Sequence, residues 1–235
     1  MTSLYRNVFW FAKGMKEYSR SGFRSACRSF NLPDLDVDCA GKVFMITGAT
    51  GTLGKVVAIQ LAQKGVHILI TNLIPLLNRS CEPRVVLVTC GTLLMQRLDP
   101  VDLQFECMFP FNGLAAFTQT KRHQAVLVEH YAETYPGIHF SAMHPGWLEP
   151  QGVKDAVPKL LRKVSVRCRS VEEAADTILW LAISQAALKH SSGMFFQDRK
   201  TTCPHIPFGK TKTSLDDEKF FMRNLEDFVN KLGLS

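Results

Sequence analysis

Three glycines at a regular spacing are the residues of this chain best suited to bind phosphate. Gly48, Gly51 and Gly54 follow Thr47 in the run TGATGTLG, which has the spacing T-G-x-x-G-x-x-G. Because glycine has no side chain, the backbone of such a turn can come close to phosphate oxygens. The run therefore indicates a site for the pyrophosphate of a dinucleotide, and an ordinary tight turn without a ligand is the alternative.

The segments on either side of the glycines are those that such a site requires. Val43 to Ile46 form an apolar run typical of a short buried strand, and Leu53 to Ala62 carry apolar residues at helical spacing. A helix that begins at the turn presents free N–H groups and a positive dipole end to the phosphates. Strand, turn and helix together favour the nucleotide interpretation over the plain turn.

The rest of the chain alternates between short apolar runs and helical patterns. This alternation predicts an α/β fold, a truncated Rossmann-like parallel sheet with flanking helices. Only eleven residues, 73–83, separate a predicted strand over 66–72 from the next one over 84–89, which is at the short limit for a parallel crossover. The predicted strands are 66–72, 84–89, 138–143 and 193–197. Helices are predicted over 121–135, over 174–184 after a capping box at 170–173, and after a cap at 214–217. The last helix has one apolar face, formed by Phe221, Leu225, Phe228 and Leu232.

We divide the chain into an N-terminal extension (1–41), a shortened Rossmann-like domain (42–200) and a C-terminal tail with a helix (201–235). In the extension, aromatic and aliphatic residues interleave with basic ones at roughly helical spacing. Two interpretations are open. We favour a helix that packs its aromatic side on the domain over a basic amphipathic helix that lies on an anionic membrane through residues 1–30. The basic residues of that segment are Arg6, Lys13, Lys16, Arg20, Arg24 and Arg28, against the single acid Glu17.

The composition argues against several kinds of site. The chain has 235 residues and a formal net charge of +7, yet it lacks an aromatic-and-basic nucleic-acid motif, so we expect no nucleic-acid partner. Seven scattered cysteines without a C-x-x-C pair indicate reduced thiols in an intracellular compartment and no metal site. No apolar run reaches the roughly 18 residues that a spanning helix needs, so any membrane association is expected to be peripheral.

Several landmarks, taken in order, resemble the short-chain dehydrogenase/reductase family, whose members have an NAD(P)-binding Rossmann fold. They are the Thr47–Gly54 turn, the strand that ends at Cys90, the segment 117–121 and Pro145-Gly146. The resemblance implies an NAD(P)-dependent oxidoreductase that acts on a small-molecule carbonyl or alcohol. It also implies that Thr47, Gly48, Gly51 and Gly54 hold the pyrophosphate, that Lys121 binds the nicotinamide ribose, and that Pro145 and Gly146 place backbone near the nicotinamide.

Two substitutions remove hydroxyl groups that the resemblance implies for catalysis. Phe117 stands four residues before Lys121, where the family has the tyrosine that gives a proton to the carbonyl oxygen. Cys90 stands where the family has the serine that holds this oxygen, and a thiol is a weak donor. Loss of a general acid typically costs on the order of a hundred- to ten-thousand-fold in rate. Of the family roles of Lys121, only the contact with the nicotinamide ribose would remain, and a plain surface lysine is the alternative. For Pro145-Gly146 the alternative is a plain turn at a strand end.

A segment that the family carries is also missing. Only residues 65–83 separate the first helix from Arg84, whereas one βαβ unit takes roughly 30 residues or more. The second half of the adenosine site then has no room, so we expect NAD or NADP to bind weakly or not at all. The predicted strand 66–72 matches either the second or the fourth strand of the family, and the latter match makes Asn72 a remnant of a family motif.

The sequence therefore predicts a family member by descent whose oxidoreductase chemistry is impaired. Such a chain would be a pseudoenzyme and a truncated isoform of a longer protein. The alternative is a non-enzymatic interaction or membrane-surface protein that uses the basic N-terminal helix, and a third is a product that folds poorly. Binding of NAD(P), measured as a thermal shift of the purified chain, discriminates between them, because a ligand of the native state raises its apparent stability.

Overall fold

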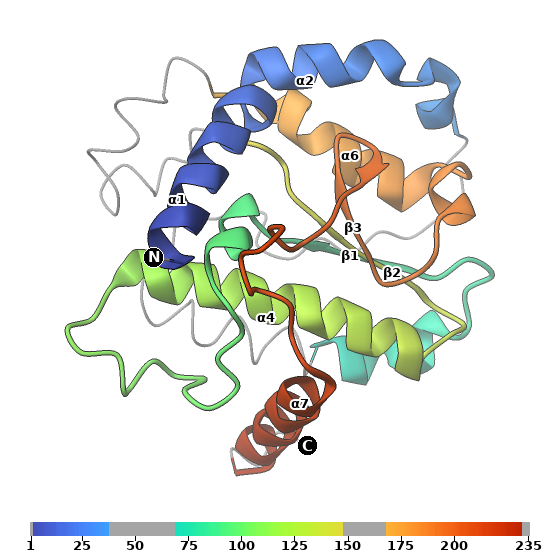
Figure 1. The fold of residues 1–235 in the computed structure, drawn as a ribbon. Coiled ribbons are helices and arrows are strands. Elements are labelled where there is room, and N and C mark those ends of the chain that lie inside the picture. The colour runs from blue at the N-terminus through green and yellow to red at the C-terminus, as the bar shows by residue number, and fades with distance from the viewer. Residues whose placement is uncertain (1, 38–68, 148–167, 232–235) are drawn as a thin grey trace.

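In the computed structural model the described residues are 2–37, 69–147 and 168–231, and they form an α/β structure (Figure 1). Their sheet has four strands, of which the first three are parallel and the fourth is antiparallel to the third. The predicted α/β fold with a truncated Rossmann-like sheet is confirmed. The strands are β1 (Arg84–Val88), β2 (His139–Met143), β3 (Met194–Gln197) and β4 (Lys200–Thr201).

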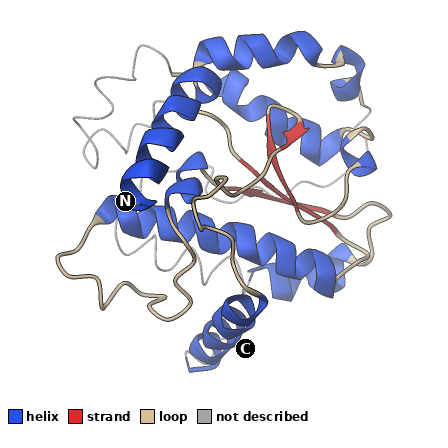
Figure 2. Ribbon diagram, viewed as in Figure 1, coloured by secondary structure: helices blue, strands red, loops and turns tan. Residues whose placement is uncertain are grey.

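Helices bury both faces of the sheet, as parallel strands require. On one face the register partners Leu87, Ala142 and Phe195 join the core cluster that contains the buried side of helix α4 (Gly113–Thr134). On the other face the partners Met143 and Phe196 pack with side chains of helix α6 (Val171–Ile183). Successive strand residues point to opposite faces, so each short strand contributes to both clusters. Figure 2 shows α4 and α6 on the two sides of the strands.

Side-chain caps fix where the helices begin. α4 begins after Asn112, whose Oδ1 accepts hydrogen bonds from two backbone N–H groups of the first turn. This start lies well before the predicted one at Lys121, so Phe117 and Lys121 belong to the same helix. The predicted capping box of α6 is confirmed: Glu173 N–H donates to Ser170 Oγ at 3.2 Å, and Ser170 N–H donates to Glu173 Oε2 at 2.9 Å.

The predicted C-terminal helix is confirmed as α7 (Leu215–Lys231). Ser214 Oγ accepts a hydrogen bond from the N–H of Asp217 at 3.1 Å, as the predicted cap requires. Phe221 and Leu225, two of its predicted apolar residues, are buried in the main core.

The N-terminal segment packs on the sheet domain. It contains α1 (Thr2–Lys13), a π-helical turn η1 (Gly14–Tyr18) and α2 (Arg20–Ala26), followed by the short turns η2 (Cys27–Ser29) and η3 (Leu32–Leu35). Trp10 and Tyr18 lie in the main core cluster, as expected of a helix that packs its aromatic side on the domain. None of the helices in the described parts of the chain is long and apolar enough to cross a membrane.

The strand predicted over 66–72 is wrong where the structure describes it. Residues 69–77 are helical, and Asn72 lies exposed on this helix, so it is no remnant of a strand end. The physical reason is the spacing: Ile70 is buried, and Ile74 and Leu77 pack against the same core cluster at helical intervals. A short apolar run alone does not distinguish a strand from one buried helix face. Residues 66–68 of that prediction lie outside the described part.

Candidate functional site

The carboxyl ends of β1 and β2 meet at one edge of the sheet, where open parallel sheets bind their ligands. β1 continues into Thr89 and Cys90, and the Thr89 N–H donates to the carbonyl of Met143 at 2.8 Å. β2 continues into residues 144–146. The structure therefore brings Cys90 and the predicted Pro145-Gly146 turn to the same edge.

Lys121 reaches this edge from α4. Its Nζ donates to the carbonyl of Val88 at 3.0 Å and to Gln124 Oε1 at 3.1 Å. The hydroxyl of Thr89 donates back to the carbonyl of Lys121 at 2.9 Å. Burial lowers the pKa of Lys121, and nearby Cys90 opposes that shift. In this arrangement the ammonium group ties the end of β1 to α4.

Phe117 lies one helical turn before Lys121, and Lys121 Nζ is 5.7 Å from the centroid of its ring. A cation at this distance is attracted to the face of an aromatic ring, but the ring offers no proton. Cys90, which follows β1, is half-buried beside them. The three predicted catalytic positions are thus neighbours in space, with one cation, one apolar ring and one thiol.

Tyr18 enters the same edge from the N-terminal segment. Its side chain is only 1% exposed, and its ring lies edge-on to the ring of His144, with 4.3 Å between centroids. A Cβ on Gly91 would lie 2.8–2.9 Å from the ring and hydroxyl of Tyr18, so only glycine admits the phenol at this distance. Burial, then Cys90, raises the pKa of the Tyr18 phenol, which therefore stays neutral. Burial and Arg169 lower the pKa of His144 to about 3, so this imidazole is neutral as well.

Arg169 closes the other side of the edge. Its guanidinium makes a bidentate, buried ion pair with Asp198, with N–O distances of 2.6 and 3.0 Å. It also donates to the backbone carbonyls of Tyr18, Glu17 and Pro145 at 3.1, 2.7 and 3.3 Å. Gly146 has φ +84°, and a Cβ there would overlap Arg169 Nε. The turn at Pro145-Gly146 therefore admits the arginine.

The comparisons with known proteins agree with this reading of the scaffold. Dehydrogenase/reductase SDR family member 12 of Homo sapiens is 33% identical over 313 aligned positions, which cover 97% of this chain and 98% of the relative. The protein of that name from Bos taurus is 31% identical over 314 positions, with coverage of 97% and 99%. The chain belongs to the short-chain dehydrogenase/reductase family. No family model matches the chain.

This family member is shorter than its alignment with the human relative. The alignment with the human relative runs over 313 positions, 78 more than the 235 residues of this chain. The residues predicted to hold the pyrophosphate, Thr47, Gly48, Gly51 and Gly54, lie outside the described residues.

At the nicotinamide end, the described residues of this family member do not fit a bound cofactor. Tyr18 and the guanidinium of Arg169 fill the edge between Cys90 and Gly146, and the carbonyl of Pro145 already accepts from Arg169. Lys121 is likewise engaged with the carbonyl of Val88. A ribose or a nicotinamide ring would have to displace these groups.

The sequence did not single out Tyr18, Arg169 or Asp198 for this site. Tyr18 stood among several aromatic residues of the extension, and Arg169 stood in a cluster of basic residues from 159 to 169. The available signal was a glycine three positions after β1 and another three positions after β2, at Gly91 and Gly146, because glycine near a strand end often marks a close approach.

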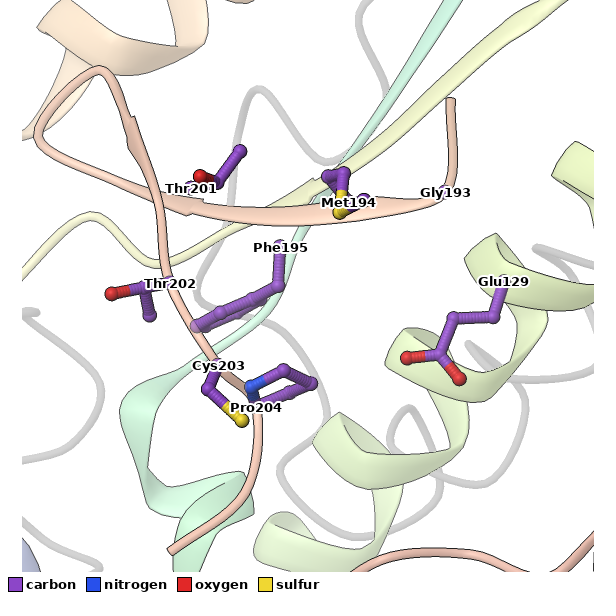
Figure 3. A pocket seen from close by; sticks show the side chains of 8 residues that line it. All are labelled: Glu129, Gly193, Met194, Phe195, Thr201, Thr202, Cys203 and Pro204. Carbon is purple, nitrogen blue, oxygen red and sulfur yellow. The ribbon is translucent and has the colours of Figure 1, made fainter. Parts of the chain in front are cut away.

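A separate hollow of about 290 Å³ lies farther along α4 (Figure 3). Glu129 projects toward it from α4, two turns beyond Lys121. Burial and the neighbouring Glu218 raise the pKa of Glu129 to about 7. Within the described residues no group of three His, Cys, Asp or Glu side chains could hold a metal ion. The other residues that line the hollow are Gly193, Met194, Phe195, Thr201, Thr202, Cys203 and Pro204.

Proposed function

We propose that this chain is an NAD(P)-dependent oxidoreductase by descent, of the class that acts on a small carbonyl or alcohol, and that its catalysis is strongly impaired. Membership of the family and the names of the two relatives support the reaction class. Three side chains support the impairment of catalysis: Phe117, Cys90 and Lys121.

The ring of Phe117 beside Lys121 carries the proposal. Reduction of a carbonyl needs a donor that gives a proton to its oxygen, while the hydride belongs to the cofactor. The group one turn before Lys121 and 5.7 Å from its Nζ is a phenyl ring, which has no proton to give. Cys90 at the end of β1 offers only a weak donor to the developing oxyanion.

A shortened chain also supports weak binding of the cofactor. We place the missing positions between the helix predicted after the glycine turn 47–54 and strand β1. The residues there, 65–83, are too few for the second half of an adenosine site. NAD or NADP would then be held mainly by the glycine turn 47–54, and its affinity is expected to be low. A truncated isoform of a longer protein is the origin that fits this arrangement.

The proposal is tested by the oxidation of NADH and NADPH with a panel of small aldehydes and ketones. We expect no rate above background for the unmodified chain. The double variant Phe117→Tyr/Cys90→Ser restores both hydroxyls and is expected to stay far below an intact family member, because the cofactor remains poorly held. Phe109→Tyr, at a phenylalanine that is 98% exposed, is the control for adding a phenol. Rapid turnover by the unmodified chain would refute the impairment.

A peripheral membrane contact is a second proposal, for residues 1–30. Leu4, Val8 and Phe11 recur on one side of α1 and are 70%, 60% and 38% exposed. We expect co-sedimentation with vesicles that contain anionic lipid, and loss of it in Leu4→Ser/Val8→Ser. Absence of sedimentation by the unmodified chain would contradict this contact. We also propose an intracellular, reducing compartment, because scattered cysteines without a C-x-x-C pair are typical of reduced thiols.

A further inference from the structure

The side chain of Tyr18 occupies the edge of the sheet where a ligand would lie. It is wedged between the ends of two parallel strands, with Gly91 after β1 on one side and His144 after β2 on the other. Trp147 closes a third side, with its ring centroid 6.0 Å from that of Tyr18. In an open α/β sheet, the crevice outside the carboxyl ends of the strands is the general place of ligand binding. A tyrosine ring and a ligand cannot share this volume.

The backbone around Tyr18 is held by groups from the same edge. The carbonyl of Tyr18 accepts hydrogen bonds from the N–H of Trp147 at 2.7 Å and from Arg169 Nε at 3.1 Å. The carbonyl of Glu17 accepts from Arg169 at 2.7 Å. Gly14 packs directly against the indole of Trp147, where a Cβ would overlap the ring. In Figure 1 the loop after β2 runs up to the turn between α1 and α2.

The segment that carries Tyr18 is a short turn between two helices. Residues 14–18 form one π-helical turn, and the buried Ser19 caps α2 by accepting the N–H of Gly22 at 3.2 Å. π-helical turns are rare in proteins, and those that do occur are often found at functional sites. The turn therefore concentrates its contacts with the edge in a few residues, and above all in the ring of Tyr18.

We propose that residues 14–19 form a plug, which in the described conformation closes the carboxyl edge of β1 and β2 from within the same molecule. A nucleotide, or a carbonyl substrate beside it, reaches Cys90 and Gly146 only after Tyr18 has left. The identity of the excluded ligand rests on the proposed function, whereas the plug itself rests on the contacts of Tyr18. The apparent Kd of a ligand is then its intrinsic value divided by the fraction of molecules with the plug open.

The reactivity of Cys90 tests the plug without any nucleotide. The full chain is exposed to iodoacetamide under native conditions, and the alkylation of each cysteine is followed by peptide mass spectrometry. Tyr18→Ala is expected to raise the rate at Cys90 about tenfold, because alkylation follows access to the thiolate. The exposed Cys203 is the internal reference and should react equally in every variant. Tyr5→Ala, at a tyrosine of α1 that is 43% exposed, is the matched control and should leave Cys90 unchanged.

Two further variants separate opening of the plug from general unfolding. Gly91→Ala adds a methyl group against the Tyr18 ring without removing any core side chain, and it should also raise the rate at Cys90. Tyr18→Phe keeps the ring and should leave the plug closed. The far-ultraviolet circular dichroism of each variant is expected to match that of the unmodified chain. Unchanged alkylation of Cys90 in both Tyr18→Ala and Gly91→Ala would overturn the plug.

Binding of NADH and NADPH, followed by nucleotide fluorescence, gives the second readout. We expect Tyr18→Ala to bind at least about tenfold more tightly than the unmodified chain, as a larger open fraction requires. Equal Kd values in the two chains, with Cys90 opened, would overturn the competition between plug and nucleotide. Opening of Cys90 with no nucleotide binding by any variant would support the plug and overturn the nucleotide part of the proposed function. The two failures are thus distinguishable.

Discussion

Replacement of Arg169 by methionine should be among the most destabilising single substitutions in this chain. The arginine side chain is 1% exposed and that of Asp198 is 7% exposed, so their ion pair is removed from water. Methionine keeps much of the length of the arginine and removes the charge and every donor. The carboxylate of Asp198 then stays buried without its cation, and the carbonyls of Glu17 and Tyr18 each lose a donor.

The magnitude follows from the burial of this pair. Removing one partner of a buried ion pair costs about 3–5 kcal/mol, chiefly because the other charge is left uncompensated. For a chain of this length, each kcal/mol lowers the melting temperature by about 2–4 °C, so we expect a fall of about 6–20 °C. The double variant Arg169→Met/Asp198→Asn should recover part of the loss, because it also removes the stranded charge.

Urea unfolding at pH 7, followed by tryptophan fluorescence and circular dichroism, measures the free energy of unfolding, and a thermal scan of the same samples measures the melting temperature. The control is Arg97→Met, which breaks an ion pair with Asp217 of similar length, 2.8 Å, whose arginine side chain is 59% exposed. That pair should contribute at most about 1 kcal/mol. A loss of less than about 1 kcal/mol in Arg169→Met, equal to that of the control, would refute the argument that this guanidinium holds the edge together.

Three further substitutions or conditions test other buried groups by the same unfolding assay. Burial lowers the pKa of His123 to about 4 and that of His144 to about 3, so the unfolded chain binds protons that the folded chain does not; stability should fall as the pH drops below about 6.5, by at most about 3 kcal/mol for each at pH 4. Burial raises the pKa of Glu129 to about 7, so the folded chain holds a proton there that the unfolded chain releases, and the free energy of unfolding falls as the pH rises from about 4.5 to 7. Above pH 7, Glu129→Gln should be more stable than the unmodified chain by about 1–3 kcal/mol. Equal stability of the two chains at that pH would contradict the raised pKa. Gly146→Ala places a Cβ at φ +84° against Arg169 and should cost about 2–4 kcal/mol, whereas Gly137→Ala, where a Cβ meets nothing within 4 Å, is the control.

The elements that the sequence predicts correctly are those with local signals. β1, β2 and β3 are short apolar runs bounded by turn residues, and α6 and α7 begin with side-chain caps that involve neighbouring residues. These signals depend on hydrogen bonds and side-chain alternation within a few positions, so the sequence reveals them directly. The sequence predicted a strand where residues 69–77 form a helix, because a short strand and one face of a helix both bury apolar side chains. Only the contacts of these side chains with the core show that they recur at helical intervals.

The candidate site was predictable only in part, because it combines local and distant relations. Phe117 and Lys121 lie one turn apart on one helix, so their proximity follows from spacing alone. Tyr18 and Arg169, in contrast, are 151 positions apart in the chain, and no periodicity relates them. Their meeting depends on how the N-terminal segment packs on the sheet, which is a property of the whole fold.

The basic residues near the N-terminus have a structural use that the net charge conceals. Arg20 and Arg24 both approach Glu173 of α6, at 3.3 and 3.8 Å, next to the capping box. The guanidinium of Arg199 lies 4.4 Å from the ring centroid of Phe30 and donates to the carbonyl of Asn31. These contacts hold the segment after the plug against α6 and against the turn between β3 and β4, while α1 holds the segment before it through Trp10. Because both flanks are anchored, opening of the plug can be confined to the few residues around Tyr18, and alkylation of Cys90 should report that opening before the fold as a whole gives way.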